Sequence, residues 1–200
     1  MTLKTINLRN RISLDAQQER EVKTMIILLS VFISALIFGI SLTNQNKEII
    51  ADVFNNINKD SEVFTDIFIK SFFTNFILLI IIFIAGFSSI GIPSVMFSII
   101  IKAFCIGCSC ACFVSEYGLS GIGMFLLTVF PSNIIYVVTL LLASDLSILQ
   151  SIDILSLIYE KNQNKILIRK YIYKILIFVI LILVGAVSES FLYIIFRNFF

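Results

Sequence analysis

Long uninterrupted apolar stretches constrain this chain more than any other feature. One charge-free stretch runs from Thr24 to Thr43, and a second runs from Ser71 to Ile101. A membrane-spanning helix needs about 20 predominantly apolar residues. Only helices or a closed barrel satisfy the backbone polar groups inside a bilayer. The stretches are continuous rather than alternating, so they predict an all-α fold, a polytopic helical membrane bundle.

The apolar stretches divide into about five transmembrane helices. The second stretch continues to Ser115, which is too long for one helix. Gly91 and Pro93 divide it, because glycine favours a turn and the residue before a proline is pushed out of helical geometry. Two further stretches are interrupted by Pro131 and by Glu189. The predicted spans are 24–43, 71–89, 95–115, 122–143 and 175–196, and they form a single transmembrane domain, 24–200, behind an N-terminal arm of residues 1–23.

The placement of lysine and arginine predicts the orientation of the bundle, because cytoplasmic segments carry an excess of both. The N-terminal arm holds five of them, and the loop between the fourth and fifth spans holds another five. These two segments lie on one side in a five-span chain, whereas the other side receives four. We therefore expect the N-terminus in the cytoplasm and the C-terminus outside.

The four cysteines lie close together between Cys105 and Cys112. Their C-x-x-C spacing suggests a zinc or redox site. On a helix, however, Cys110 points away from the other three, and the chain has no histidine to complete a mixed site. Thiols surrounded by lipid stay inert, so we interpret the cysteines as small apolar filler and predict no metal or cofactor. The net charge of +2 gives no indication of a nucleic-acid partner.

Lys102 is the most informative single residue. A charge at the centre of a span costs about 2.5–3.5 kcal/mol on insertion scales, and it marks a functional site by default. One interpretation has Lys102 extending to the cytoplasmic surface. The other places it in a buried polar network, because it begins a less apolar stripe at helical spacing: Lys102, Cys105, Ser109, Cys112 and Glu116.

Other intramembrane polar residues support the network. Pro131 removes a helical hydrogen bond and frees a carbonyl group, and Asn133 lies at about the depth of Lys102. We therefore expect Lys102 to point toward the helix that carries these two residues. Asn75 and Glu189 are the remaining polar groups, and both are expected nearer the outer face.

Two segments between the predicted spans are amphipathic. Residues 49–57 and 63–68 carry apolar side chains on one helical face, and residues 146–159 repeat the pattern on the cytoplasmic side. Such segments fit interfacial helices lying on the bilayer or docking surfaces for a partner. The outward segment 44–70 is mildly acidic, which favours a partner, so Val53, Phe54 and Phe64 are docking candidates.

From Ser71 to Ser144 the chain resembles the stage II sporulation protein M family. The resemblance rests on the following residues: Ser71-Phe72, Asn75, Gly86, Ile90-Gly91-Ile92-Pro93, Lys102, Gly107, Tyr117-Gly118, Gly121, Val129-Phe130-Pro131 and Asn133. The total length and the five spans also fit this family.

The resemblance implies a non-enzymatic, multi-pass subunit of the cell membrane. In endospore formers, such a protein holds two peptidoglycan hydrolases, stage II sporulation proteins D and P, in the mother-cell membrane at the septum. They remodel septal wall so that the membrane can engulf the forespore. Besides these hydrolases the expected partners are membrane lipids, and a homo-oligomer is left open.

A second hypothesis is a small permease or the membrane subunit of a transporter, in which Lys102, Asn133 and Glu189 line a path. A permease should arrange its polar residues around a continuous hydrated cavity, whereas a scaffold should enclose them in a packed core. Intramembrane catalysis has no supporting set of residues in the sequence.

Overall fold

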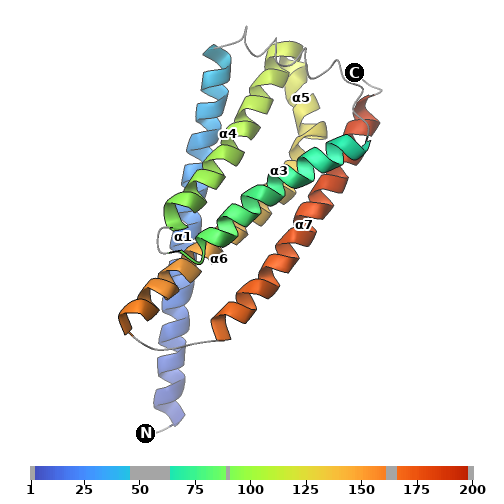
Figure 1. Ribbon diagram of the computed structural model, residues 1–200. Coiled ribbons are helices and arrows are strands. Elements are labelled where there is room, and N and C mark those ends of the chain that lie inside the picture. The colour runs from blue at the N-terminus through green and yellow to red at the C-terminus, as the bar shows by residue number, and fades with distance from the viewer. Residues whose placement is uncertain (1–2, 46–63, 89–90, 161–165, 198–200) are drawn as a thin grey trace.

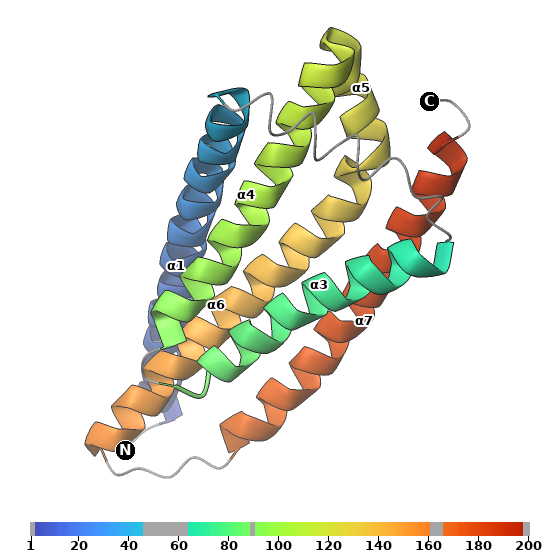
Figure 2. The ribbon, with the colours of Figure 1, turned by 45° about the horizontal axis from the view of Figure 1, so that its top comes forward.

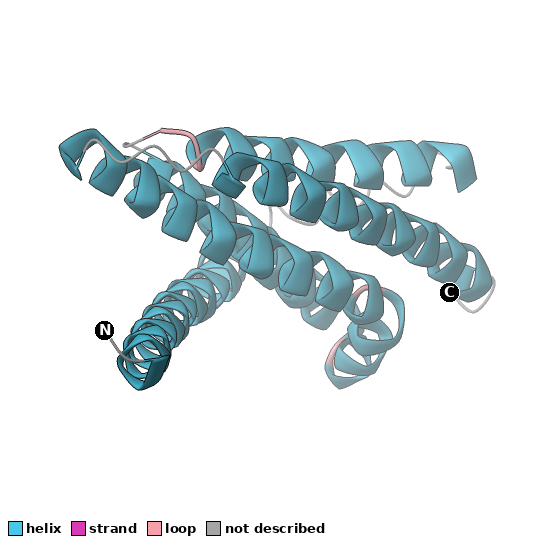
Figure 3. Cartoon of the chain, turned by 90° about the horizontal axis from the view of Figure 1, so that it is seen from below, coloured by secondary structure: helices cyan, strands magenta, loops and turns pink. Residues whose placement is uncertain are grey.

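The computed structural model describes residues 3–45, 64–88, 91–160 and 166–197, which form six helices (Figure 1). The described ranges contain helices and short turns but no strand, as Figure 3 shows, so the predicted all-α class is confirmed. The helices are α1 (Leu3–Gln45), α3 (Phe64–Ala85), α4 (Gly91–Tyr117), α5 (Leu119–Thr128), α6 (Phe130–Glu160) and α7 (Ile166–Arg197).

Five segments are long and apolar enough to cross a membrane, which confirms the predicted polytopic bundle. Helix α1 begins and α7 ends at opposite ends of the bundle (Figure 1), as an odd number of spans requires. Many large apolar side chains point outward, where lipid tails can cover them. The candidate spans are Glu19–Gln45, Phe64–Ala85, Gly91–Tyr117, Phe130–Ile152 and Tyr173–Ile195.

The hairpin between α3 and α4 lies about four residues earlier in the chain than predicted, since α3 ends at Ala85 rather than at residue 89. Helix α4 begins at Gly91 rather than near Val95. Pro93 therefore lies in its first turn, where the missing N–H removes no helical hydrogen bond. A Cβ atom at Gly91 would overlap the carbonyl group of Ala85, so only glycine allows this close return of the chain.

The fourth span differs from the predicted range 122–143. The chain turns at Gly118, whose φ is 62°, and then forms the short helix α5. The helix breaks at Val129 and restarts as α6, whose membrane segment is Phe130–Ile152. Pro131 explains the break, because proline offers no N–H to the carbonyl group four residues earlier and its ring collides with that group.

The two amphipathic segments are not separate helices where the structure describes them. Residues 146–159 continue α6 without interruption as far as Glu160. At the other segment, Phe64 begins α3, so residues 64–68 form the first turns of a span. Residues 49–57, which include Val53 and Phe54, lie outside the described residues.

Helix α6 organises the bundle, because it contacts α1, α3, α4, α5 and α7. It runs between the pair α1 and α4 and the pair α3 and α7 (Figure 2). Helices α1 and α4 approach closely through glycine, since a Cβ atom at Gly39 would lie 2.6 Å from the Phe104 carbonyl oxygen. Gly107 is packed in the same way against the backbone of Leu36.

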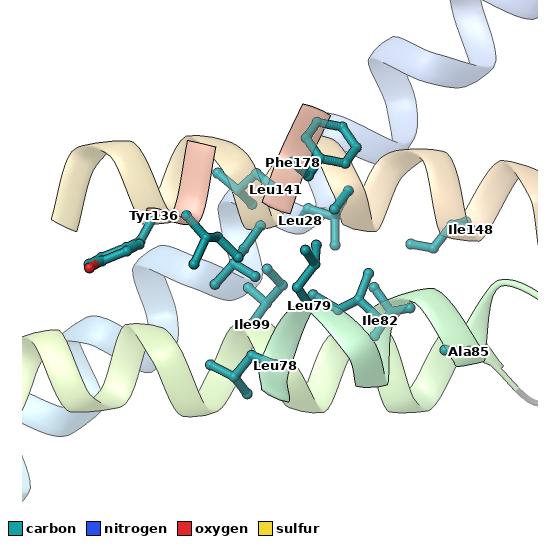
Figure 4. Packing of buried hydrophobic residues seen from close by; sticks show 14 residues of the cluster. Leu28, Leu78, Leu79, Ile82, Ala85, Ile99, Tyr136, Leu141, Ile148 and Phe178 are labelled. Atoms are coloured by element: carbon teal, nitrogen blue, oxygen red, sulfur yellow. The ribbon is translucent and has the colours of Figure 1, made fainter. Parts of the chain in front are cut away.

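The apolar core fills the middle of this arrangement (Figure 4). Side chains from α1, α3, α4, α6 and α7 contribute to it, and several are wholly buried. The most deeply buried aliphatic members are Leu28, Leu79, Ile82, Val95, Ile99, Leu140 and Ile182.

Candidate functional site

Four polar side chains from four helices meet inside the membrane-spanning region. We call Ser71 on α3, Lys102 on α4, Tyr136 on α6 and Glu189 on α7 the charged cluster. The Lys102 ammonium lies over the Tyr136 ring, 4.6 Å from its centroid. Such a cation–π contact contributes about 2 kcal/mol where the partners are desolvated. The amine therefore points at α6 and does not extend to a membrane surface.

A chain of hydroxyl groups continues the charged cluster to the carboxylate. Ser71 donates a hydrogen bond to Glu189 Oε2. The Tyr136 hydroxyl lies 2.7 Å from Ser71 Oγ, and it acts as the donor because the serine proton is committed to the carboxylate. Lys102 also interacts electrostatically with Glu189. One positive and one negative group thus balance each other across the bundle.

Close packing holds the tyrosine at the centre of the charged cluster. Tyr136 has no exposed surface. A Cβ atom at Gly185 would lie 2.6 Å from the ring carbon Cε1, so the glycine lets α7 lie directly against the ring. Glu189 follows Gly185 by one helical turn and therefore projects from the same side of α7. The glycine and the carboxylate act together to place α7.

Asn75 lies one turn from Ser71 on the same face of α3 and is 3% exposed. Its side-chain nitrogen donates to the Ser71 carbonyl oxygen at 2.8 Å. Its side-chain oxygen is buried and accepts no hydrogen bond from the described residues. A buried amide oxygen without a partner costs free energy. The Asn75 side-chain oxygen is therefore an unused hydrogen-bond acceptor beside the charged cluster.

The structure brings some of the predicted site residues together and leaves others apart. Lys102 points toward α6, as expected, but its contact is Tyr136 and not Asn133. Asn133 instead donates to the Val129 carbonyl oxygen at 2.9 Å, at the break beside Pro131. Lys102 follows the start of α4 by eleven residues, about 16 Å, so it lies near the middle of this 27-residue helix.

Sequence reasoning missed Tyr136 and gave Ser71 no polar role. Tyr136 follows Asn133 by three residues, so both lie on one face of a helix. A tyrosine on the polar face of an otherwise apolar span is a signal that could have identified it. Ser71 carries no comparable signal, because one serine at the start of an apolar stretch is common.

The remaining glycines of the family pattern serve chain packing. Gly118 makes the turn between α4 and α5. Gly121 lies against the backbone of Phe113, where a side chain would overlap it. Gly86 lies beneath the Tyr171 hydroxyl group. These positions shape the bundle and bring no reactive group to the charged cluster.

The cysteines of α4 are free thiols. Cys108 lies at the α1 interface, where its sulfur contacts the Gly39 carbonyl oxygen at 3.7 Å. Cys105 is exposed on the surface of the bundle. Within the described residues, no group of three or more histidine, cysteine or acidic side chains could hold a metal ion.

A second tyrosine forms a different cluster toward the other end of α6. We call Phe83, Phe87, Ser147 and Tyr171 the aromatic cluster. The Tyr171 hydroxyl lies 2.8 Å from Ser147 Oγ, and its ring stacks on Phe83 at 5.2 Å between centroids. These contacts tie α7 and α6 to the end of α3 beside the hairpin.

A family comparison covers all of these residues. The model of the family described as stage II sporulation protein M matches residues 26–192. The chain belongs to the stage II sporulation protein M family. Both clusters lie within the matched range. No curated protein and no solved structure matches the chain. With its five candidate spans, the protein is a sporulation-related membrane protein.

Proposed function

We propose that the protein is a non-enzymatic membrane scaffold that gathers peptidoglycan hydrolases during forespore engulfment. It lies in the mother-cell membrane at the septum and holds stage II sporulation proteins D and P there. Cleavage of the wall belongs to these partners. Membership of the stage II sporulation protein M family supports this role.

The observation that carries the proposal is the way in which the intramembrane charges are used. Lys102 rests on Tyr136, and Glu189 accepts from Ser71, so the polar groups bind helices to one another. Contacts of this kind fix the relative positions of α3, α4, α6 and α7. A rigid bundle of fixed shape is what a scaffold requires.

The permease hypothesis requires a polar path through the membrane. Along α6, the buried positions between Tyr136 and Ser144 include Leu140 and Leu141, which are 1% and 5% exposed. Thr139 lies among them, but its hydroxyl donates to the Ile135 carbonyl oxygen of its own helix. Apart from the buried Ser144 hydroxyl group, a packed apolar layer therefore separates the charged cluster from the aromatic cluster, and this arrangement favours the scaffold.

Affinity purification from sporulating cells after crosslinking tests the proposal. Both hydrolases should be recovered with the tagged chain. A second chain, with Val53, Phe54 and Phe64 changed to serine, tests whether the outward segment recruits them, because it should insert normally and recover less of each enzyme. Recovery of transporter subunits without either hydrolase would contradict the scaffold.

A further inference from the structure

A crevice lies between α3, α6 and α7 at the end of the bundle where α3 ends and α7 begins. Figures 1 and 2 show α3 and α7 diverging toward this end. The empty space of the crevice is about 210 Å³. Each helix contributes one face to it, because its lining residues follow one another at helical spacing. Among them are Leu79, Ile82 and Phe83 on α3, and Lys174, Ile175 and Phe178 on α7.

The inner part of the crevice suits a hydrocarbon chain. Two hydroxyl groups line it, and both already have partners. The Tyr171 hydroxyl donates to the Phe83 carbonyl oxygen at 3.3 Å and accepts from Ser147 at 2.8 Å. Apart from these groups and Lys174, the lining side chains are hydrocarbon. An enclosed water needs two to four polar partners, so the interior favours an apolar occupant over water.

Lys174 places a positive charge at the open side of the crevice. It is exposed, and it is the second residue of the candidate span Tyr173–Ile195. It therefore lies at the depth of the lipid headgroups. Phe178 follows one helical turn further into the membrane, about 6 Å along α7. The crevice thus has a cationic end at the membrane surface and apolar walls that run inward.

The charge around this end of α7 is positive on balance. Asp145 on α6 interacts electrostatically with Lys174 and with Glu21 on α1, and it accepts a hydrogen bond from Thr24. Against these two carboxylates, residues 161–174 carry five lysine and arginine residues and no acidic residue. Basic segments at a membrane surface attract anionic headgroups. The headgroup that matches the open side is therefore negatively charged.

The size of the crevice decides how much of a ligand enters it. Pockets that enclose a whole small ligand measure about 300–1,000 Å³. A space of about 210 Å³ takes only part of an amphiphile, and the rest stays in the bilayer. We propose that the crevice binds an anionic phospholipid, with one acyl chain along the apolar walls and the phosphate group on Lys174. The site concerns the bilayer and does not depend on the proposed scaffold.

The test reconstitutes the full chain in vesicles of phosphatidylglycerol and phosphatidylcholine in equal amounts. The two lipids carry the same acyl chains, so they differ in the headgroup and its charge. After extraction with detergent, native mass spectrometry counts the lipids that stay on the protein. Phosphatidylglycerol should be retained in preference to phosphatidylcholine.

One pair of variants tests the charge. Lys174→Gln should lower the preference for phosphatidylglycerol about fivefold, which is the effect of one lysine at a membrane surface. Arg20→Gln is the matched control, because Arg20 is exposed and is the second residue of the span Glu19–Gln45. It should leave the preference unchanged. Both residues are exposed, so neither change should disturb the fold, which circular dichroism checks.

A second pair of variants tests the apolar walls. Ile175→Trp places a larger side chain in the crevice and should lower the retained phosphatidylglycerol to the level of phosphatidylcholine. Ile177→Trp adds the same group to α7 at a position that is 56% exposed, and it should leave retention unchanged.

Each other outcome overturns the inference. Equal retention of the two lipids by the unchanged chain would contradict an anionic ligand. An equal loss in Lys174→Gln and Arg20→Gln would show a diffuse attraction to the whole surface and no site at the crevice. Full retention by Ile175→Trp would show that the acyl chain lies elsewhere.

Discussion

The charged cluster and the aromatic cluster use the same three kinds of residue to different ends. In each, a tyrosine hydroxyl meets a serine, and a glycine makes room for the tyrosine: Gly185 on α7 for Tyr136, and Gly86 in the turn after α3 for Tyr171. Around Tyr136 the further neighbours are a cation and a carboxylate, whereas around Tyr171 they are phenylalanine rings. Stacked rings join the ends of α3, α6 and α7 at the second cluster, whereas a balanced pair of charges joins α3, α4, α6 and α7 at the first.

Thiol labelling that tests the membrane orientation of the bundle should give the largest effect, because each position is either accessible to the reagent or not. In a background without the native cysteines, a membrane-impermeant thiol reagent should label a cysteine placed at Asn46 and not one at Asn164. This result would put the charged cluster nearer the outer surface. Labelling at position 164 and not at position 46 would show that the bundle has the opposite orientation, with the charged cluster nearer the cytoplasm.

Removing one charge should destabilise the protein strongly. Lys102→Met leaves Glu189 without its counter-charge, and breaking such a pair costs about 3–5 kcal/mol when it is buried. The double change Lys102→Met and Glu189→Gln should recover most of the loss. Unfolding in mixed detergent micelles, followed by circular dichroism, measures both. Equal stability of the single and double variants would show that the two groups are not coupled.

Alanine in place of Gly185 or Gly86 should lower the stability of the protein, because each glycine lies against a buried tyrosine. At Gly185 the added methyl group meets the buried Tyr136 ring, which cannot move aside, so overpacking should cost about 1–3 kcal/mol. At Gly86 it meets the hydroxyl end of Tyr171, which is also buried and is held by Ser147 and by the Phe83 ring, so a loss of similar size is expected. The same unfolding assay measures both variants, and unchanged stability of either one would refute the packing assigned to that cluster.

Phenylalanine at either tyrosine should give the smallest effect. Tyr136→Phe keeps the ring beneath Lys102, and Ser71 keeps its bond to Glu189. Tyr171→Phe keeps the stacking on Phe83. Hydrogen bonds between membrane helices contribute about 0.6 kcal/mol on average, so each variant should lose about that much. Tyr136→Leu, which removes the ring, should lose distinctly more than Tyr136→Phe.

The sequence predicted the number of spans, the family and the direction of Lys102, because these depend on local features. Length and hydropathy decide where a helix can cross a membrane. The cost of a buried charge makes Lys102 point toward protein. The predicted start of α4, at residue 95, lies four residues after the observed start at Gly91. The sequence could not decide this, because Pro93 fits the first turn of a helix as readily as it fits a loop.

The charged cluster as a whole was beyond sequence reasoning. Ser71 and Glu189 are far apart in the chain, and their meeting depends on how α3 and α7 cross α6. Helical periodicity says which residues share a face but not the angle at which two helices pack. Residues 146–159 show the opposite error, because an amphipathic pattern does not reveal whether a helix is separate or continues a span.

The most direct test of the scaffold is the position of the hydrolases in sporulating cells that lack this protein. Fluorescent fusions of stage II sporulation proteins D and P should spread around the mother-cell membrane, although their amounts and their activity on purified wall stay normal. The septal wall should remain thick in electron micrographs. If both hydrolases still gather at the septum without the protein, the scaffold is contradicted.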